Sequence, residues 1–337
     1  MAVERLGGLG EIEGWTRPAE RPPAVKILSG IATFARRKPL GFVCGLVILT
    51  LIIVGDLVPV TLNGVFSLAG IDTRVPYVAD AIAPYRYDKN HLKDRLQKCV
   101  LGGMPAICPA RTYKLGTDEL GRDILSRLLY GARVSVIVPF GAVAISETMA
   151  ATIGIMSAYY GGWVDKISLR IVDIFQALPG LVVLITVLGI FGTGLWQLIV
   201  VIGVLGGPPG SRIIRGQVLS IMSEPYVEAA RVVGAGDRRI MLRYVLPNVF
   251  ALIILGSTIR LGGVVLIEAS LSFLGYGLPP PFPSWGQMLS LQGREYMRSA
   301  PGLAVYPGIA IGIIVFSYNL FGDALRDTLD PRLRGNR

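Results

Sequence analysis

The chain of 337 residues has few of the side chains on which enzymes and metal proteins depend. Its one histidine, His91, excludes any site that needs two or more histidine ligands, and no nucleophile motif lies beside it. No lysine follows a glycine, so the chain lacks a Walker A loop, and any ATP hydrolysis must take place on another chain. Charged residues make up 17% of the sequence, against ~25% in typical soluble domains. The sequence therefore excludes an ordinary soluble globular protein, and we expect no catalytic residue and no metal site.

The chain contains several long apolar runs, and hydrophobic residues make up 52% of the sequence. About 20 apolar residues are needed to cross the ~30 Å hydrocarbon core of a bilayer. The runs that meet or approach this length lie at 40–60, 134–160, 171–192, 195–210, 248–275 and 302–322. The run at 195–210 is short and is interrupted by Gly-Gly-Pro-Pro, so a broken span is expected there. The predicted fold class is an all-α membrane protein with six transmembrane helices.

Lysine and arginine residues gather in the short segments on one side of these six spans. Seven precede the first span, two separate the second and third, six separate the fourth and fifth, and four follow the sixth. Because short cytoplasmic loops carry the excess of positive charge, these segments and both termini are predicted to be cytoplasmic. The net charge of +10 is then a consequence of topology, and we expect no nucleic-acid partner.

This topology divides the chain into five parts. They are a cytoplasmic tail over 1–39, a first transmembrane helix over 40–60, an extracytoplasmic segment over 61–130, a core with five transmembrane helices over 131–325 and a cytoplasmic tail over 326–337. Residues 25–37 have the apolar spacing of a short amphipathic helix on the inner membrane face. Cys99 and Cys108 lie in the outer segment, in an oxidising compartment, where they could form a disulfide.

The loop before the fifth span, residues 223–247, has the pattern of a short helix that lies along the membrane surface. Ser223 is suited to cap its start, and Gly234 is suited to end it in a left-handed conformation. Ala229 and Ala230 carry almost no side chain, so another surface can approach the helix backbone closely. On these grounds alone the segment is either a docking helix or merely a connection between two spans.

The same residues resemble the EAA loop of ABC importer permeases. Glu228-Ala229-Ala230 is followed by Gly234 and then by Leu246-Pro247, with Tyr244 where that family usually has isoleucine. Five longer blocks resemble the C-type membrane subunit of the dipeptide/oligopeptide/nickel permease family, and they occur in the family's order. These blocks lie at 116–135, 159–180, 216–235, 268–289 and 319–334.

The resemblance implies a type I ABC importer permease in the bacterial plasma membrane, one of two different membrane subunits of its complex. Two separate ATPase subunits would bind ATP and Mg²⁺, a binding protein outside would deliver a di- or oligopeptide, and this chain would bind no cofactor. Relatives in the same family handle nickel chelates or glutathione, which are the alternative substrates. The helix in the 223–247 loop would be the coupling helix that docks on an ATPase. The residues expected in this docking site are Glu224, Tyr226, Glu228, Ala229, Ala230, Arg231, Gly234, Ala235, Leu246 and Pro247.

Ionisable residues within the predicted spans are further candidates. Glu147, Arg260 and Glu268 lie at membrane depth, where a charge is costly and should therefore face a pore or another helix. Arg260 and Glu268 are eight residues apart, about 12 Å along a helix, so they are not expected to pair directly. We place Arg260 and Glu268 along the substrate path, with packing between helices or subunits as the alternative.

Three further interpretations concern the outer segment and the class of protein. Asp118, Glu119 and Asp123 form an acidic cluster that suits a hard cation, but capping of the following helix by Thr117 or Asp118 explains them better. The long, tyrosine-containing segment 61–113 is predicted to be an ordered external element that contacts the binding protein. A secondary transporter or an intramembrane enzyme would be alternatives of another class, but the sequence has no internal repeat and no nucleophile site.

Overall fold

A computed structural model describes residues 31–54, 82–96, 113–290, 296 and 300–329. Within these ranges the chain is built from helices joined by turns, with one isolated β-bridge between Thr117 and Asp123. The predicted disulfide between Cys99 and Cys108, most of the segment 61–113 and the ends of both predicted tails lie outside the described residues.

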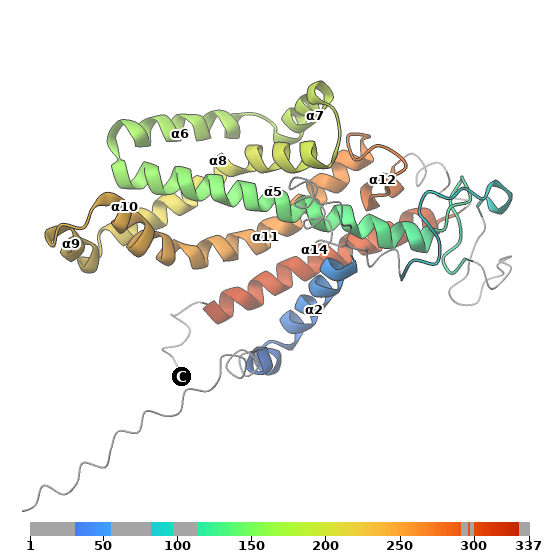
Figure 1. Cartoon of the computed structure of the whole chain (residues 1–337), viewed down its shortest axis with the longest axis horizontal. Coiled ribbons are helices and arrows are strands. Elements are labelled where there is room, and N and C mark those ends of the chain that lie inside the picture. The colour runs from blue at the N-terminus through green and yellow to red at the C-terminus, as the bar shows by residue number, and fades with distance from the viewer. Residues whose placement is uncertain (1–30, 55–81, 97–112, 291–295, 297–299, 330–337) are drawn as a thin grey trace, which may run out of the picture.

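The helices follow one another along the chain as labelled in Figure 1. They are α2 (Pro39–Val54), the short 3₁₀ turn η1 (Leu92–Asp94), α5 (Ile124–Tyr160), α6 (Gly162–Ala177), α7 (Gly180–Phe191), α8 (Leu195–Met222), α9 (Pro225–Val232), α10 (Asp237–Ile240), the π-helix η2 (Met241–Val245), α11 (Leu246–Phe273), α12 (Trp285–Leu289) and α14 (Gly302–Leu329).

Four helical stretches in the described part of the chain are long and apolar enough to cross a membrane. They are Ile124–Tyr160, Leu195–Met222, Asp237–Phe273 and Gly302–Thr328. The number rises to five if α6 and α7 count as one bent span, and α2 is a shorter apolar helix of 16 residues. The all-helical architecture with several apolar spans is therefore confirmed, while the count of six stays a prediction.

The run at 171–192, predicted as one span, is divided between two helices. α6 ends at Ala177, α7 begins at Gly180, and the two helices are bent by 88° relative to each other. Pro179 explains the break, because its ring disfavours a helical conformation of the preceding residue. Leu178 is accordingly extended, with φ −95° and ψ 138°.

The run at 195–210 behaves in the opposite way, because the predicted break is absent. α8 continues through Pro208-Pro209 without interruption. Polar neighbours occupy the nearby carbonyls: Ser211 Oγ donates to the carbonyl of the first proline at 2.7 Å, and Arg260 Nη1 donates to the Gly206 carbonyl at 3.0 Å. Membrane helices tolerate proline more readily than soluble ones, and these donors lie close to the prolines, although the carbonyls that lose their helical partners are those of Val204 and Leu205, four residues earlier.

The long helices pack closely because glycines lie at their contacts. α5 and α8 run side by side and form the centre of the bundle (Figure 1). A Cβ on Gly203 of α8 would lie 2.8 Å from the Ile145 side chain of α5, so only glycine permits this approach. α2 packs on α14 in the same manner, where Gly41 lies against Ala324.

The bundle has two distinct ends (Figure 1). α9 and α10 project at one end, where α5 finishes and α11 begins, while α12 and residues 82–96 lie at the opposite end. Consecutive long helices run in alternating directions between these ends. An ion pair joins the start of α2 to the last turn of α14, with 2.5 Å between Lys38 Nζ and Asp327 Oδ2. The fold therefore presents the loop 223–247 as one tip of the molecule.

Candidate functional site

α9, the helix predicted in that loop, begins without a side-chain cap. Glu224 holds the N-cap position with an extended backbone, and Pro225 occupies the first turn. Proline fits there because it needs no backbone donor and its φ is already helical. The prediction that Ser223 caps the helix is wrong, because its hydroxyl donates to the Ser220 carbonyl of α8 at 2.8 Å instead.

The two faces of α9 differ sharply in burial. Val227 is fully buried, in a cluster that includes Ile221 of α8 and Val249 of α11. At the far end of the helix, Val232 and Val233 are 87% and 88% exposed. Burying a valine side chain contributes about 1.5–3 kcal/mol, so one face anchors the helix on the bundle. The other face offers apolar surface to a second molecule.

A left-handed glycine ends α9, as the sequence predicts. Gly234 has φ +83°, and its N–H donates to the Arg231 carbonyl at 2.9 Å, while the Ala235 N–H donates to the Ala230 carbonyl at 3.0 Å. These two bonds form a Schellman motif, which satisfies the last carbonyls of the helix and turns the chain back. A Cβ on Gly234 would meet nothing within 4 Å, so backbone conformation alone requires glycine there.

The chain returns to the bundle through a widened turn. α10 leads into the π-helix η2, and α11 then starts with Pro247 in its first turn. Two hydrogen bonds tie this return to its surroundings: Tyr159 Oη of α5 donates to Asp237 Oδ1 at 2.7 Å, and Asn248 Nδ2 donates to Tyr226 Oη at 3.2 Å. The loop is therefore fixed to α5 on one side and to α11 on the other.

The structure brings the predicted docking residues to this one tip. The exposed ones are Glu224, Tyr226, Glu228, Ala229, Arg231, Gly234 and Pro247, and the partly buried ones are Ala230, Ala235 and Leu246. Sequence reasoning missed Val232 and Val233. Valines at the end of an amphipathic helix are normally assigned to the core, and no sequence signal distinguishes these two from Val227.

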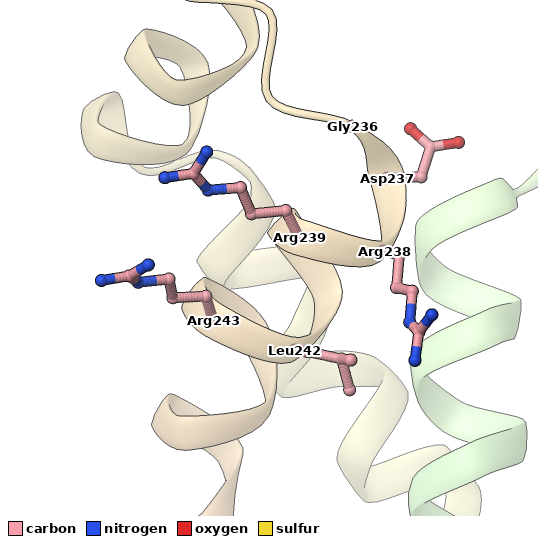
Figure 2. A pocket seen from close by; sticks show the side chains of 6 residues that line it. All are labelled: Gly236, Asp237, Arg238, Arg239, Leu242 and Arg243. Carbon is pink, nitrogen blue, oxygen red and sulfur yellow. The ribbon is translucent and has the colours of Figure 1, made fainter.

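Beside α9 lies an open hollow of about 600 Å³ that the sequence pattern does not predict (Figure 2). Its walls are Gly236, Asp237, Arg238, Arg239, Leu242 and Arg243, from α10, η2 and the turn before them. Figure 2 shows Arg239 and Arg243 pointing to the same side and Asp237 pointing away from both. Three of the six residues are arginines, but the surface of the hollow itself is mostly apolar, and Arg238 points to the other side from Arg239 and Arg243 (Figure 2).

Arg260 lies midway along α11, where three helices meet. Its Nε is 3.2 Å from Glu147 Oε1 of α5, and its Nη1 donates to the Gly206 carbonyl of α8 at 3.0 Å and to Ser146 Oγ. A Cβ on Gly210 would lie 2.6 Å from Arg260 Nη2, so glycine makes room for the guanidinium. Sequence reasoning identified both charges but not their pairing, because they are far apart along the chain.

Glu268, two turns further along α11, is fully buried. Its carboxyl oxygens accept from Ser272 Oγ at 2.7 Å and from Ser135 Oγ at 3.4 Å. Arg260 is held by other partners, so the two residues do not pair, in agreement with their spacing. Since Glu268 has no exposed surface in this conformation, its role in a substrate path stays a prediction.

At the opposite end of the bundle, the acidic cluster organises the start of α5. Asp123 Oδ2 accepts from the Ser126 N–H at 2.8 Å and caps the helix, while Asp118 Oδ2 lies 2.6 Å from Arg122 Nε. Capping therefore explains the cluster, but Thr117 and Asp118 are not the cap, because Asp123 lies directly before the first helical residue. No group of three His, Cys, Asp or Glu side chains that suits a metal occurs among the described residues.

The described part of the outer segment packs against this cluster. The Tyr85 N–H donates to Ser126 Oγ at 3.1 Å, and Tyr113 Oη donates to Asp94 Oδ2 at 3.1 Å. Burial and the hydrogen bond to Asp94 raise the pKa of Tyr113 to about 12. Residues 82–96 thus form part of the outer end of the bundle, and their contact with a binding protein stays a prediction.

The chain matches the family described as "Binding-protein-dependent transport system inner membrane component" over residues 150–335. It is similar to the glutathione transport system permease protein GsiD of Pectobacterium atrosepticum, with 37% identity over 260 residues, 77% of this chain and 83% of the relative. The protein of the same name from Escherichia coli O1:K1 is 40% identical over 227 residues, 67% of this chain and 75% of the relative.

Among solved structures, the chain is similar to an inward-facing form of the MetNI methionine ABC transporter. The TM-score is 0.50 at 20% identity, over 61% of this chain and 98% of that chain. At this identity the likeness concerns the fold alone, which is the type I ABC permease fold.

Proposed function

Because the chain belongs to the binding-protein-dependent transport system inner membrane components, we propose that it forms half of a pore for short peptides, with glutathione foremost. The chain is a permease subunit of an ABC importer in the bacterial inner membrane, and ATP hydrolysis belongs to separate subunits. The glutathione permeases to which it is 37% and 40% identical support this substrate. Other di- and oligopeptides belong to the same chemical class, and a nickel chelate is the alternative outside it.

The difference in burial between the two faces of α9 carries the proposal that this helix is the coupling helix. A helix that only joined α8 to α11 would gain stability by burying Val232 and Val233 as it buries Val227. Instead both valines are exposed at the tip of the bundle, close to the small side chains of Ala229 and Ala230. Burying the two valines in a cleft of an ATPase subunit would contribute about 3–6 kcal/mol before the cost of association.

Two other docking residues lie on the exposed surface of α9 and beside α5. Glu228 is exposed on the first turn of α9, and the guanidinium of Arg231 lies 5.9 Å from the Tyr159 ring of α5. A force on α9 reaches α11 through the buried cluster around Val227 and through Leu246-Pro247, where that span starts. Closure of the ATPase pair on ATP would in this way move α11 and the pore together.

The proposed topology has six spans and places both termini in the cytoplasm. The six are α2, the bent pair α6–α7 and the four long helical stretches. The alternating helix directions (Figure 1) and the Lys38–Asp327 ion pair support it, because they bring the residues next to the two tails together. The arginines of the 223–247 loop then face the cytoplasm, as short basic loops do.

This topology keeps the domain boundaries predicted from the sequence. Residues 61–130 lie outside the cell, and the core of 131–325 carries the pore. α5 begins at Ile124, so its first turns lie within the outer segment.

A second, different permease subunit is proposed to complete the pore. Much of the bent pair α6–α7 is exposed, including Trp163 at 77% and Ile190 at 73%. Facing another membrane subunit would cover part of this surface, and the substrate path would lie between the two subunits. Two ATPase subunits would hold ATP and Mg²⁺, the binding protein would dock on the outer end, and this chain would bind no cofactor.

Arg260 and Glu268 are the residues that we place on the substrate path. The Arg260 side chain is 27% exposed, so its guanidinium can attract a carboxylate of a passing peptide. Glu268 is enclosed by α5 and α11, and it would reach a substrate only after these helices separate. Its contribution therefore belongs to a later state of the transport cycle.

Uptake by the complete importer tests the proposed function. Proteoliposomes that contain this chain, its partner permease and the two ATPases, with the binding protein outside, are supplied with labelled glutathione, a labelled dipeptide or nickel. Glutathione should accumulate only when ATP is on the ATPase side. Preferential uptake of nickel would contradict the peptide proposal, and uptake of the dipeptide but not of glutathione would contradict the choice within it.

A further inference from the structure

Charged side chains meet between α6 and α8, which run side by side (Figure 1). Arg212 of α8 donates from Nη2 to Asp173 Oδ1 and from Nη1 to Gln176 Oε1, both on α6. Arg170, one turn before Asp173, places its Nη1 3.9 Å from Asp173 Oδ2. The side chains of Asp173 and Arg212 are 46% and 44% exposed, and that of Arg170 is 85% exposed. These residues, named here the α6–α8 cluster, can therefore be reached by a ligand.

The cluster lies at membrane depth. Exposed tryptophans are typical of membrane interfaces, and Trp196 and Trp163 lie near the outer end of α8 and the inner end of α6. Arg212 lies about 24 Å along the axis from Trp196, and Asp173 lies about 15 Å from Trp163. Together these distances approach the ~40–45 Å of a bilayer with its headgroups. Asp173 and Arg212 therefore lie inside the hydrocarbon core, and Arg170, about 10 Å from Trp163, lies near its inner edge.

The cluster borders a face of α8 that is buried in its outer half and exposed in its inner half. Ile202 is 4% exposed, whereas Ile213, three helical turns later on the same face, is 66% exposed. Arg212 lies on one side of Ile213, and Gly210, which makes room for Arg260, lies on the other. Charged side chains at membrane depth face protein or water and avoid lipid. The inner half of this face is therefore suited to line an aqueous path that leads to the cytoplasm.

The chemistry of the cluster favours a ligand with charges of both signs. Two arginines and one aspartate give it a net charge of +1. A ligand ammonium can take the place of Arg212 on Asp173, while a ligand carboxylate takes the place of Asp173 on Arg212. This exchange leaves no charge without a partner inside the membrane, where such a charge would be costly. Gln176 keeps its hydrogen bond to Arg212 meanwhile and holds the guanidinium in place.

We propose that the α6–α8 cluster binds the charged groups of the peptide substrate on the inner half of its path. Asp173 accepts from the ammonium group, Arg212 donates to the carboxylate on the same carbon, and Arg170 binds a second carboxylate nearer the cytoplasm. Glutathione carries one ammonium group and two carboxylates, so its net charge of −1 complements the cluster. A dipeptide without an acidic side chain lacks the second carboxylate and is held more weakly.

Because it requires a substrate path, this site rests on the proposed function, but the two can fail separately. Uptake of glutathione by the wild-type importer tests the function. The site is tested by whether its variants still distinguish glutathione from derivatives in which one charged group is blocked. Uptake by the wild type, combined with unchanged discrimination in the variants, would refute the site alone.

The experiment measures equilibrium binding to the importer assembled with its partner permease and ATPases in nanodiscs, without ATP and without the binding protein. Glutathione, N-acetylglutathione and the glycine ethyl ester of glutathione are compared by saturation-transfer NMR. The wild type should bind each blocked derivative about 5–10-fold more weakly than glutathione, because each loses one charge-assisted contact at a half-exposed site. Equal binding of all three ligands, or no binding at millimolar concentration, would overturn the proposal.

Each variant should lose the discrimination that belongs to its own contact. Asp173→Asn should bind glutathione and N-acetylglutathione within two-fold of each other but still reject the ester. Arg170→Gln should show the opposite pattern, with the ester bound nearly as well as glutathione. Arg212→Gln should weaken all three ligands, since each keeps the carboxylate that this residue binds. Variants that weaken all three ligands alike at Asp173 and Arg170 would mean that the cluster only joins α6 to α8.

Two controls separate the site from surface charge and from misfolding. Lys166→Gln removes one positive charge one turn before Arg170 on α6, where the ammonium lies 5.4 Å from the Trp163 ring. It should bind all three ligands within about two-fold of the wild type. Asp173→Glu and Arg212→Lys keep the charges and should retain the wild-type order of ligands. Loss of discrimination in Lys166→Gln, or in both conservative variants, would contradict the assignment.

Discussion

Gly234 and Gly236 form a matched pair in which backbone conformation can be separated from packing. Gly234 has φ +83° and Gly236 has φ −68°, and a Cβ on either would meet nothing within 4 Å. Gly234→Ala forces a side chain into the left-handed region, at a cost of about 1–2 kcal/mol. Gly236→Ala has no such cost, and it should stabilise the folded loop by about 0.4–1 kcal/mol through the unfolded chain.

The consequence for docking follows from the same numbers. If the turn at Gly234 must form for α9 to enter the ATPase cleft, a strain of 1 kcal/mol weakens docking by up to about 5-fold, and 2 kcal/mol by up to about 30-fold. Gly234→Asn should fall between the wild type and Gly234→Ala, because asparagine tolerates the left-handed region better than alanine. Gly236→Ala should dock as the wild type does.

The assay is binding of the purified ATPase subunits to nanodiscs that contain each variant permease, followed by transport measured per ATP hydrolysed. Gly234→Ala should show both the weaker docking and a lower transport ratio. Equal docking of Gly234→Ala and Gly236→Ala would refute the reasoning, because the two substitutions differ only in the backbone conformation that they meet.

The other predictions concern stability and are measured by unfolding of the purified chain in detergent. Gly286→Ala should lower the free energy of unfolding by about 1–3 kcal/mol, since its Cβ would lie 2.6 Å from a backbone atom of α11. Gly308→Ala, inside α14 with nothing within 4 Å, should not lower it and should raise it by up to about 1 kcal/mol; equal losses in the two variants would contradict this. Glu147→Gln and Arg260→Gln should each cost about 1–3 kcal/mol, and the double variant should cost less than the sum, so strict additivity would exclude the ion pair. Val227→Ala should cost about 1–3 kcal/mol because the side chain is fully buried, and a neutral result would mean that α9 is not anchored there.

Apolar periodicity and one glycine predict much of the fold. The apolar run at 302–322 lies within α14, and the run at 248–275 covers nearly all of α11. Gly234 ends α9 because few other residues adopt its backbone conformation at low cost. These features depend on the local chain, so the sequence contains the information needed to predict them.

The effect of the prolines could not be predicted from the local sequence alone. Pro179 breaks its span, whereas Pro208-Pro209 do not break α8. Pro179 stands between two helices, whereas Pro208 and Pro209 lie where α8 packs against neighbouring helices and where Arg260 of α11 donates to the Gly206 carbonyl. No pattern within the run at 195–210 reveals that a guanidinium from a distant segment lies beside it.

For the candidate site, the sequence identifies some residues, while others become visible only in the folded structure. Residue types such as Glu228, Ala229 and Gly234 are visible in the sequence, and their resemblance to a family indicates their role. The exposure of Val232 and Val233 and the grouping of arginines around one hollow are properties of the folded loop. They become visible only when α10 and η2 are placed beside α9.

The accessibility of Val233 tests most directly whether α9 is a cytoplasmic coupling helix. In a chain whose three native cysteines are replaced by serine, Val233→Cys should react with a membrane-impermeant maleimide in inside-out vesicles but not in intact spheroplasts. Lys89→Cys, an exposed position at the opposite end, should show the reverse pattern. Assembly of the ATPase subunits should protect Val233→Cys from labelling. Labelling of Val233→Cys from outside the cell, or undiminished labelling in the assembled complex, would contradict the account.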